Sequence, residues 1–177
     1  MKKMILPFAY GATIILSAFT VCSSVDWKIS DGCSIKFTSK DPAGVFTSFK
    51  GDIKFDERNL EASKFNVSVD ANSINTGNGM KNSKAKNSDW LDVDKYPTIK
   101  FVSTKISKTA GGYETIGTLE MHGIQKQVTI PFTFVNNTFT GSFNVNRLDY
   151  HIGTIKGMSA HAATDLKMDI SVPVTQQ

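Results

Sequence analysis

Apolar and polar residues alternate with a period of two along most of the chain. In one segment Phe65, Val67 and Val69 are separated by the polar residues Asn66 and Ser68. Because successive side chains of a β-strand point to opposite faces, the alternation predicts strands that each bury one face. Eight segments carry the pattern: residues 27–37, 45–55, 65–69, 99–101, 117–121, 128–134, 139–145 and 166–174.

Within each segment the apolar residues share one parity, so each strand is expected to face an interior on one side and water on the other. The second segment is expected to keep odd parity throughout, with Val45, Phe49, Ile53 and Phe55 directed inward. Turn sequences separate several neighbours and predict antiparallel connections. These turns are Asp41–Gly44, Gly111-Gly112, His122-Gly123 and Asn136-Asn137.

The fold class that this pattern predicts is all-β, with eight antiparallel strands in a closed, up-and-down barrel. Closure leaves no strand edge exposed, and eight strands enclose an interior that side chains fill or that holds one small ligand. A sandwich of two sheets fits the alternation almost as well. The alternation alone does not separate these two architectures.

Two connections are too long for plain turns, namely Asn75–Pro97 and Arg147–Thr164. Long loops in compact domains usually have a function or contain some structure of their own. The first connection is interpreted as containing a short helix that closes one end of the barrel, and a surface loop with a few apolar anchors is the alternative. The apolar residues behind this prediction are Met80, Ala85, Trp90, Leu91 and Val93.

The N-terminus has the features of a secretory signal peptide. Lys2 and Lys3 precede the uncharged stretch Met4–Val21, and the small residues Ser23-Ser24 follow it. We therefore assign residues 1–23 to a signal peptide and residues 24–177 to one domain, which predicts a periplasmic or otherwise secreted protein. A membrane anchor is one alternative, although 18 residues lie near the lower limit for a span. A lipoprotein anchored through Cys22 is the other.

Composition agrees with a single globular domain and argues against nucleic-acid binding. The chain has 177 residues, of which 40% are hydrophobic and 20% are charged. The formal net charge is only +4, and the basic residues are scattered among acidic ones. Once the signal peptide is removed, Cys33 is the one cysteine left, so no internal disulfide is expected.

Motifs that would carry catalysis or metal binding are missing from the sequence. There is no Cys-x-x-Cys, Gly-x-Ser-x-Gly or His-Glu-x-x-His motif. The three histidines lie in separate turns without ligand spacing, so no metal and no cofactor are expected. A small basic cluster in the first long connection is read either as solvated surface or as a contact for an anionic head group or membrane surface. It consists of Lys81, Lys84 and Lys86.

The inner faces of the predicted strands are rich in phenylalanine. Such faces fit two interpretations equally well, a filled barrel core or a cavity lined for an elongated apolar ligand. Eight phenylalanines are expected to point inward: Phe37, Phe49, Phe55, Phe65, Phe101, Phe132, Phe134 and Phe143.

Six stretches of sequence form, in this order, a specific combination. They are Trp27–Ile29 with Ser34–Phe37, Gly51–Asp56, Ser73–Gly77, Trp90–Val93 with Tyr96–Phe101, Gly117–Lys126, and Asn146–Tyr150. Together they resemble the YceI family of secreted, lipocalin-like proteins, over essentially the whole chain after the signal peptide. The resemblance implies an eight-stranded antiparallel barrel with a helix at one end. It also implies a long hydrophobic tunnel that binds polyisoprenoids or similar amphiphilic lipids in the periplasm.

The function we predict is therefore a non-enzymatic carrier or sequestering protein for a long-chain isoprenoid or fatty lipid. Arg147 is the candidate for contacting an anionic head group, since a guanidinium fork suits phosphate and carboxylate. A structural ion pair with Asp149 or another acidic residue is the equally weighted alternative for Arg147. The candidates for lining the tunnel are Phe37, Phe49, Phe65, Phe101, Leu119, Phe132, Phe134 and Phe143.

Two rival functions stay open at this point. One is an interaction module for envelope stress, whose barrel core is filled and binds no ligand. The other is an enzyme acting on an isoprenoid lipid, which would need an acid, base or nucleophile inside the cavity, and the apolar inner faces offer none. A transient membrane contact and a homodimer are both compatible with the sequence.

Overall fold

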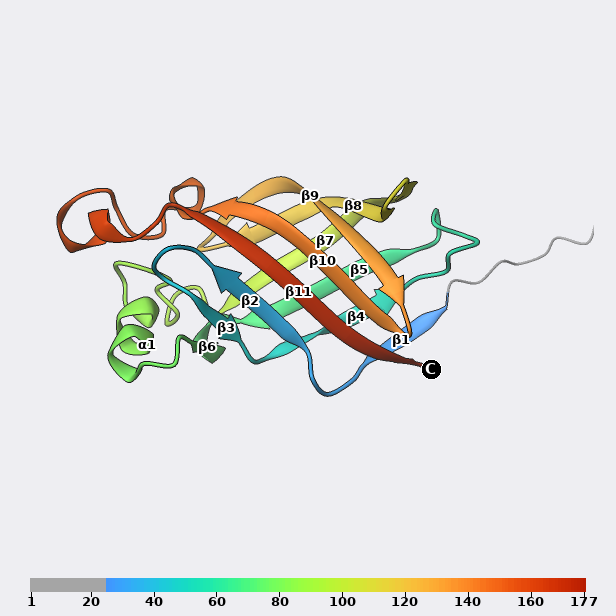
Figure 1. The fold of residues 1–177 in the computed structure, drawn as a ribbon, viewed down its shortest axis with the longest axis horizontal. Helices are drawn as coiled ribbons and strands as arrows, with labels where there is room; N and C mark the ends of the chain where they lie inside the picture. Colours follow the sequence, from blue (N-terminus) through green and yellow to red (C-terminus); the bar gives the residue numbers. More distant parts are fainter. Residues whose placement is uncertain (1–24) are drawn as a thin grey trace, which may run out of the picture.

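The computed structural model describes residues 25–177, so the predicted signal peptide, residues 1–23, lies outside the described residues. Figure 1 shows long, tilted strands that wrap around a common axis, with a short helix at one end. The first strands are β1 (Asp26–Ile29), β2 (Ser34–Thr38), β3 (Gly44–Phe46), β4 (Phe49–Lys54), β5 (Lys64–Asp70) and β6 (Ile74–Asn75). The later ones are β7 (Thr98–Thr109), β8 (Gly112–Met121), β9 (Ile124–Val135), β10 (Thr138–Asn146) and β11 (Asp165–Gln176).

The sheet closes into an eight-stranded antiparallel ring, which confirms the barrel and rules out the sandwich. The ring runs β1-β4-β5-β7-β8-β9-β10-β11, and β11 returns to pair with β1, placing Trp27 opposite Gln176. The short strands β2, β3 and β6 extend the same ring, because β2 also pairs with β11, β3 with β2, and β6 with β3. The eight predicted segments thus correspond to the eight strands of the barrel, and the first two segments, residues 27–37 and 45–55, are each broken into two strands.

The hairpins between the later strands follow the predicted turn sequences. His122 and Gly123 both have positive φ, 54° and 75°, and so do Asn136 and Asn137, at 50° and 54°. Two consecutive residues in the left-handed region suit the two-residue turns that match the twist of paired strands. The β7–β8 connection at Gly111 is a hairpin as well, with Thr109 paired to Gly112.

The expected parity of the second segment is wrong at its start. Phe46 is the buried residue of β3, whereas Val45 is only half-buried. The reason lies between β3 and β4, where the backbone N–H groups of Thr47 and Ser48 both donate to Ser73 Oγ, at 3.2 and 3.1 Å. This irregular step changes which parity faces inward, so Phe46 and Phe49 both point to the interior.

A second irregularity explains why the fourth segment is longer than its pattern. The register of β7 against β8 shifts between Ser103 and Lys105. As in a β-bulge, the shift inverts the parity of the following residues, so that Phe101 and Ile106 are both buried. Simple alternation is lost across such a step, although the strand continues to Thr109.

Four helical segments lie in the connections between strands, and three of them lie in the two long ones. The short helix predicted in the first long connection is confirmed as α1 (Gly79–Lys86), which begins after Asn78, whose side chain accepts from the N–H of Lys81. The helix is shorter than the apolar spacing suggested, because Trp90, Leu91 and Val93 lie beyond its end. The others are 3₁₀ helices: η1 (Ala71–Ser73), η2 (Arg147–Tyr150) and η3 (Gly157–His161).

Candidate functional site

The barrel encloses a cavity of about 360 Å³. This volume lies within the range of small-molecule binding sites, which are mostly apolar and concave. The inner faces of the strands line it almost entirely with aromatic and aliphatic side chains. Of the residues predicted to line a tunnel, seven do border the cavity: Phe37, Phe49, Phe65, Phe101, Leu119, Phe132 and Phe143.

Phe134 departs from the prediction and does not border the cavity. It lies one inward position beyond Phe132 along β9, where aromatic rings pack against one another. Its own ring centroid is 5.0 Å from that of Trp27 and 4.4 Å from that of Phe139. Phe46, by contrast, lines the cavity and was missed, because strict odd parity placed Val45 there instead.

One end of the barrel is closed by a cluster of rings, which we call the aromatic plug. Phe55, with 1% of its surface exposed, lies at its centre. The neighbouring ring centroids lie 5.2 to 6.2 Å from that of Phe55, mostly edge to face, an arrangement that aromatic pairs favour. The aromatic plug consists of Phe55, Phe65, Tyr113, Phe132, Phe134 and Phe139.

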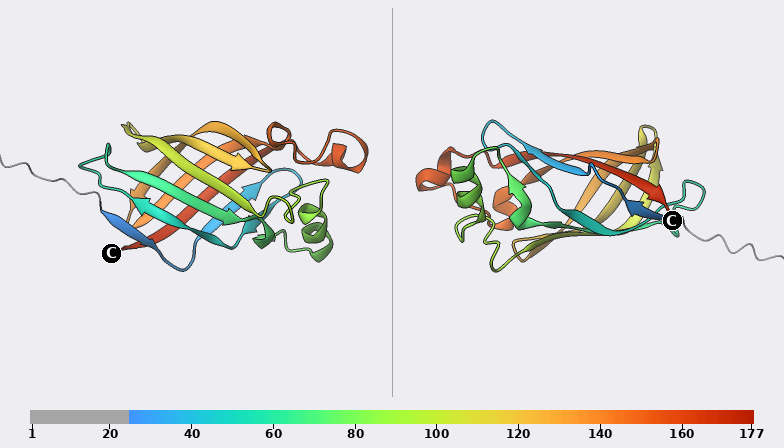
Figure 2. Two further views of the ribbon diagram at one scale, coloured as in Figure 1. Left: turned by 180° about the vertical axis from the view of Figure 1, so that it is seen from behind. Right: turned by 90° about the horizontal axis from the view of Figure 1, so that it is seen from below.

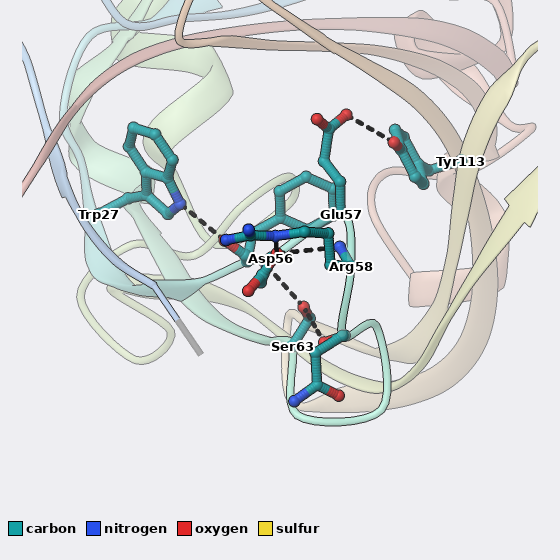
Figure 3. A network of polar contacts seen from close by, with 8 residues as sticks. Trp27, Asp56, Glu57, Arg58, Ser63 and Tyr113 are labelled. Carbon is teal, nitrogen blue, oxygen red and sulfur yellow. Dashed lines mark hydrogen bonds and ion pairs between the residues drawn. The ribbon is translucent and has the colours of Figure 1, made fainter. Parts of the chain in front are cut away.

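Polar groups behind the aromatic plug are paired with one another (Figure 3). Trp27 Nε1–H donates to the carbonyl of Phe55 at 2.9 Å, and the Tyr113 hydroxyl donates to Glu57 Oε1 at 2.6 Å. The buried Asp56 accepts from the backbone N–H of Arg58 at 2.9 Å. The hydrogen bond to Glu57 and, to a lesser degree, burial raise the pKa of Tyr113 to about 12. This end is therefore both sterically filled and satisfied in its hydrogen bonds.

The opposite end is surrounded by the two long connections. Figure 2 shows α1 and the 147–164 segment at this same end of the barrel in both views. Residues of these connections, and not only residues of strands, border the cavity here, and we therefore call it the open end. Helix α1 contributes Lys81 and Lys84, and the segment after the helix contributes Trp90 and Leu91. Met80, although apolar, is 82% exposed and does not anchor the helix.

Arg147 lies at the open end, but it is buried, with only 2% of its surface exposed. Nε donates to Ala163 O at 3.0 Å, and Nη1 donates to Ile152 O at 2.7 Å. Nη2 donates to the carbonyls of Thr154 and Ala162, each at 3.2 Å. The guanidinium thus holds the 147–164 connection in place, and its donors are directed at backbone oxygens rather than offered to an external anion.

The predicted alternative for Arg147, an ion pair with Asp149, is also not what the structure has. Asp149 Oδ1 instead lies 3.0 Å from Lys126 Nζ, on the surface. The Arg147 guanidinium stacks over the ring of Trp90, 5.1 Å from its centroid. Burial lowers the pKa of Arg147, a direction consistent with the removal of a charge from water.

The remaining polar residues that border the cavity gather at the open end. Thr76, His161 and the two lysines of α1 are among them, and Lys81 Nζ pairs with Asp41 Oδ1 at 2.9 Å. Lys86, the third lysine of the predicted basic cluster, does not border the cavity. Deeper inside, the Thr115 hydroxyl donates to the carbonyl of Lys105 at 3.3 Å.

Among residues 25–177, no group of three or more histidine, cysteine or acidic side chains is arranged to hold a metal ion. His122, for example, has Nδ1 3.0 Å from Tyr150 O and its ring against Tyr96. Cys33 is half-buried against the core, with Sγ 3.3 Å from the carbonyl of Ser30. No helix in this part of the chain has the length and apolar character needed to cross a bilayer.

A closed eight-stranded barrel around an apolar cavity defines a lipocalin-like binding barrel. The YceI-like domain model matches residues 19–174, and the chain belongs to this family. A protein of Yersinia enterocolitica named a UPF0312 protein is 30% identical over 139 residues, which cover 73% of this chain and 71% of the relative.

Solved structures show the same barrel. BcnA of Burkholderia cenocepacia superposes with a TM-score of 0.75 at 26% identity, over 84% of this chain and 99% of BcnA. A domain of Saccharophagus degradans, described as a polyisoprenoid binding domain, superposes with a TM-score of 0.61 over 88% of this chain and the whole of that domain. Since its identity is 11%, this second likeness concerns the fold alone.

Proposed function

We propose that the protein is a non-enzymatic carrier or sequestering protein for a polyisoprenoid or similar long-chain amphiphilic lipid. The observation that carries this proposal is the apolar cavity of about 360 Å³, bordered by loops at one end and stopped by the aromatic plug at the other. A preformed apolar site suits a hydrocarbon tail far better than it suits a polar metabolite. The Saccharophagus degradans domain, described as polyisoprenoid binding, supports the same ligand class.

The driving force would be the transfer of the lipid tail from water into the cavity, at roughly 0.8 kcal/mol for each buried methylene. The tail would enter from the open end and stop against the plug residues Phe65 and Phe132, which border the cavity floor. A signal peptide at residues 1–23 would bring the protein to the periplasm, where lipids must cross an aqueous space between membranes.

Binding is favoured over catalysis by the chemistry of the lining. The deep part of the cavity presents hydrocarbon and aromatic groups, and the hydroxyl of Thr115 is already bonded to the backbone. General acid–base or nucleophilic catalysis needs a titratable or nucleophilic group beside the reacting atoms. A filled, ligand-free interaction module is disfavoured by the cavity itself.

The direct test is native mass spectrometry of the protein purified from its own cell envelope without detergent. A discrete added mass that extracts into organic solvent is the expected result. A ligand-free mass, together with no uptake of prenyl or fatty chains on titration, would overturn the proposal.

A variant pair locates the binding site. Phe143→Trp adds bulk to the cavity wall and is expected to weaken lipid binding by roughly tenfold or more, since overpacking a site costs about 1–3 kcal/mol. Thr140→Trp places the same ring on the exposed face of β10 and is expected to leave binding unchanged. Equal binding by both variants, with the fold intact by circular dichroism, would contradict the assignment of the cavity as the lipid site.

A further inference from the structure

The open end presents two large apolar side chains to water. Met80, in α1, is 82% exposed, and Ile155, in the 147–164 connection, is 65% exposed. Figure 2 shows both of these segments at the same end of the barrel. A third such side chain among the described residues, Val135, is 61% exposed and follows Phe134 of the aromatic plug, at the closed end. A single exposed apolar side chain needs no explanation, whereas several at one end of a molecule can mark an interaction site.

The two segments that carry these side chains are joined at the rim of the cavity. Lys81, the neighbour of Met80, borders the cavity, and its Nζ lies 2.9 Å from Asp41 Oδ1. The connection that carries Ile155 reaches the same residue, because the N–H of Ala163 donates to Asp41 O at 2.8 Å. The exposed apolar side chains therefore belong to segments that are fixed to one another beside the mouth of the cavity.

Basic residues accompany both apolar side chains. Residues 76–88 surround Met80 in the sequence and residues 150–164 surround Ile155, and neither range contains an aspartate or a glutamate. Lysine side chains next to exposed apolar ones suit a partner that is anionic at its surface and apolar beneath it. The lysines in the two ranges are Lys81, Lys84, Lys86 and Lys156.

The charge of the connections changes sign from one end of the barrel to the other. At the closed end, the β4–β5 connection, residues 55–63, contains three acidic residues and one basic residue, and the two hairpin turns are uncharged. The open-end connections contain seven basic residues, including the buried Arg147, and five acidic ones. Such an asymmetry turns the open end toward an anionic surface. The open-end connections are residues 39–43, 71–97, 122–123 and 147–164.

We propose that the open end docks on the surface of an anionic lipid bilayer, with Met80 and Ile155 inserted among the head groups and the neighbouring lysines against the lipid phosphates. Apolar burial and attraction to anionic lipids together hold proteins at such an interface. Docking in this orientation brings the mouth of the cavity to the bilayer, so a lipid tail passes between the two without crossing water. This surface goes beyond the proposed carrier function and rests on it only for its purpose.

The test measures cosedimentation of the protein with lipid vesicles. One set of vesicles contains phosphatidylcholine alone, and the other contains about 30% phosphatidylglycerol, which supplies the anionic surface. Binding to the anionic vesicles is expected in about 0.1 M salt, with much weaker binding to the neutral ones. Binding is expected to fall in about 1 M salt, where the screening length shortens from about 10 Å to about 3 Å.

A first variant pair tests the apolar contact. The double variant Met80→Ser/Ile155→Ser is expected to weaken binding to the anionic vesicles by roughly tenfold or more, because two apolar side chains are no longer buried in the interface. Val135→Ser is the matched control at the closed end and is expected to leave binding unchanged. All three side chains are mostly exposed, so the fold should survive each change, which circular dichroism checks.

A second pair tests the charge. The double variant Lys86→Gln/Lys156→Gln is expected to weaken binding by about fivefold for each lysine and to reduce the dependence on salt. Neither lysine borders the cavity. The control, Lys64→Gln/Lys108→Gln, removes the same net charge from exposed positions near the closed end and is expected to have little effect.

Three results would overturn the inference. One is equal binding to neutral and anionic vesicles, and another is an equal loss of binding in the open-end variants and their closed-end controls. The third is a protein that binds neither kind of vesicle and forms a dimer that Met80→Ser/Ile155→Ser dissociates in analytical ultracentrifugation, which would assign the surface to a second copy of the chain.

Native mass spectrometry separates this inference from the carrier function. Uptake of a prenyl lipid delivered from ethanol, without binding to vesicles, would contradict docking alone. Binding to anionic vesicles through the open end, without uptake of any prenyl or fatty chain, would support docking and contradict the carrier function.

Discussion

Each end of the barrel has a half-buried tryptophan, and among the described residues only one of the two indole N–H groups has an acceptor. At the closed end, Trp27 donates to Phe55 O, and the aromatic plug fills the space between the strands. At the open end, the described residues provide the buried Trp90 Nε1 with no acceptor, and other parts of the Trp90 side chain border the cavity. The closed end is tightly packed, and its polar groups are hydrogen-bonded, as in a stable core. The open end differs in both respects, because it has a cavity and a buried donor without a partner among the described residues.

Departures from these rules tend to mark functional sites, because a sequence that folds well is otherwise consistent at every level. The unpaired Nε1 of Trp90 lies in the part of the barrel bordered by the long connections, and the cavity extends from there to the aromatic plug. We infer that the closed end mainly stabilises the fold and that the open end mainly binds the ligand. Substitutions at matched positions can test this division, beginning with the one of largest effect.

Phe55→Ala is expected to lower the free energy of unfolding by about 3–5 kcal/mol, because it leaves a void at the centre of the aromatic plug. Leu91→Ala at the open end removes a buried side chain that borders the cavity and is packed on fewer sides than Phe55, so its cost is expected at the lower end of the range for such truncations, about 2 kcal/mol. Urea unfolding measures both. An equal cost at the two ends would contradict the proposed division.

Arg147→Met is expected to cost about 1–3 kcal/mol, since it leaves buried carbonyls of the 147–164 connection without their donor. Amide hydrogen exchange should rise in that connection and stay low in β8 and β9. Lys126→Met is the control, because the exposed pair of Lys126 with Asp149 is worth about 0–1 kcal/mol. Faster exchange across the whole barrel would show that Arg147 supports more than the open end.

The two tryptophans give the sharpest comparison when no ligand is bound. Trp27→Phe leaves the carbonyl of Phe55 without its donor and is expected to cost about 1 kcal/mol more than Trp90→Phe, which removes an unpaired donor. Both changes remove the same part of an indole ring, so the difference between them reports the hydrogen bond. Thermal or urea unfolding of the two variants checks it, and a larger cost for Trp90→Phe would be the contrary result.

The smallest effect at neutral pH concerns Tyr113 and Glu57. The folded protein holds the pKa of Tyr113 at about 12, above the ordinary value of about 10 in an unfolded chain. The stability that this proton contributes is therefore complete below pH 10 and is lost as the pH rises through 12. Absorbance at 295 nm follows the titration. Glu57→Gln is expected to move the pKa of Tyr113 back toward 10, and an unchanged titration would exclude Glu57 as the main cause.

Much of the fold could be predicted from the sequence because alternation directly reports which face of a strand is buried. Phe65, Val67 and Val69 are placed as their spacing requires. Prediction failed where the backbone leaves the regular ladder, as at Thr47 and Ser48 between β3 and β4, because Ser73, distant in sequence, accepts the hydrogen bonds that accompany the step. A one-residue change of this kind leaves no local signal in the sequence.

The candidate site was only partly predictable, for a related reason. Inward parity identified Phe101 and Phe143, but parity cannot say how far along the axis a residue lies, so Phe134 was placed in the cavity and not in the aromatic plug. The partners of Arg147 are backbone carbonyls in the irregular parts of the 147–164 connection, and no residue type in the sequence indicates such partners. The unpaired N–H of Trp90 is a property of its three-dimensional surroundings and has no counterpart in the sequence.

The pairing of β1 with β11 has a consequence for the order of events during biosynthesis. Trp27 stands near the start of the described chain, and its partner in the ring, Gln176, is among the last residues of β11. The hairpins of the later strands can form as they emerge, since their contacts are local. The ring cannot close, however, until β11 has been made and released. No enclosed cavity exists before that moment, so any lipid must be acquired by the finished barrel and cannot serve as a template around which the nascent chain folds.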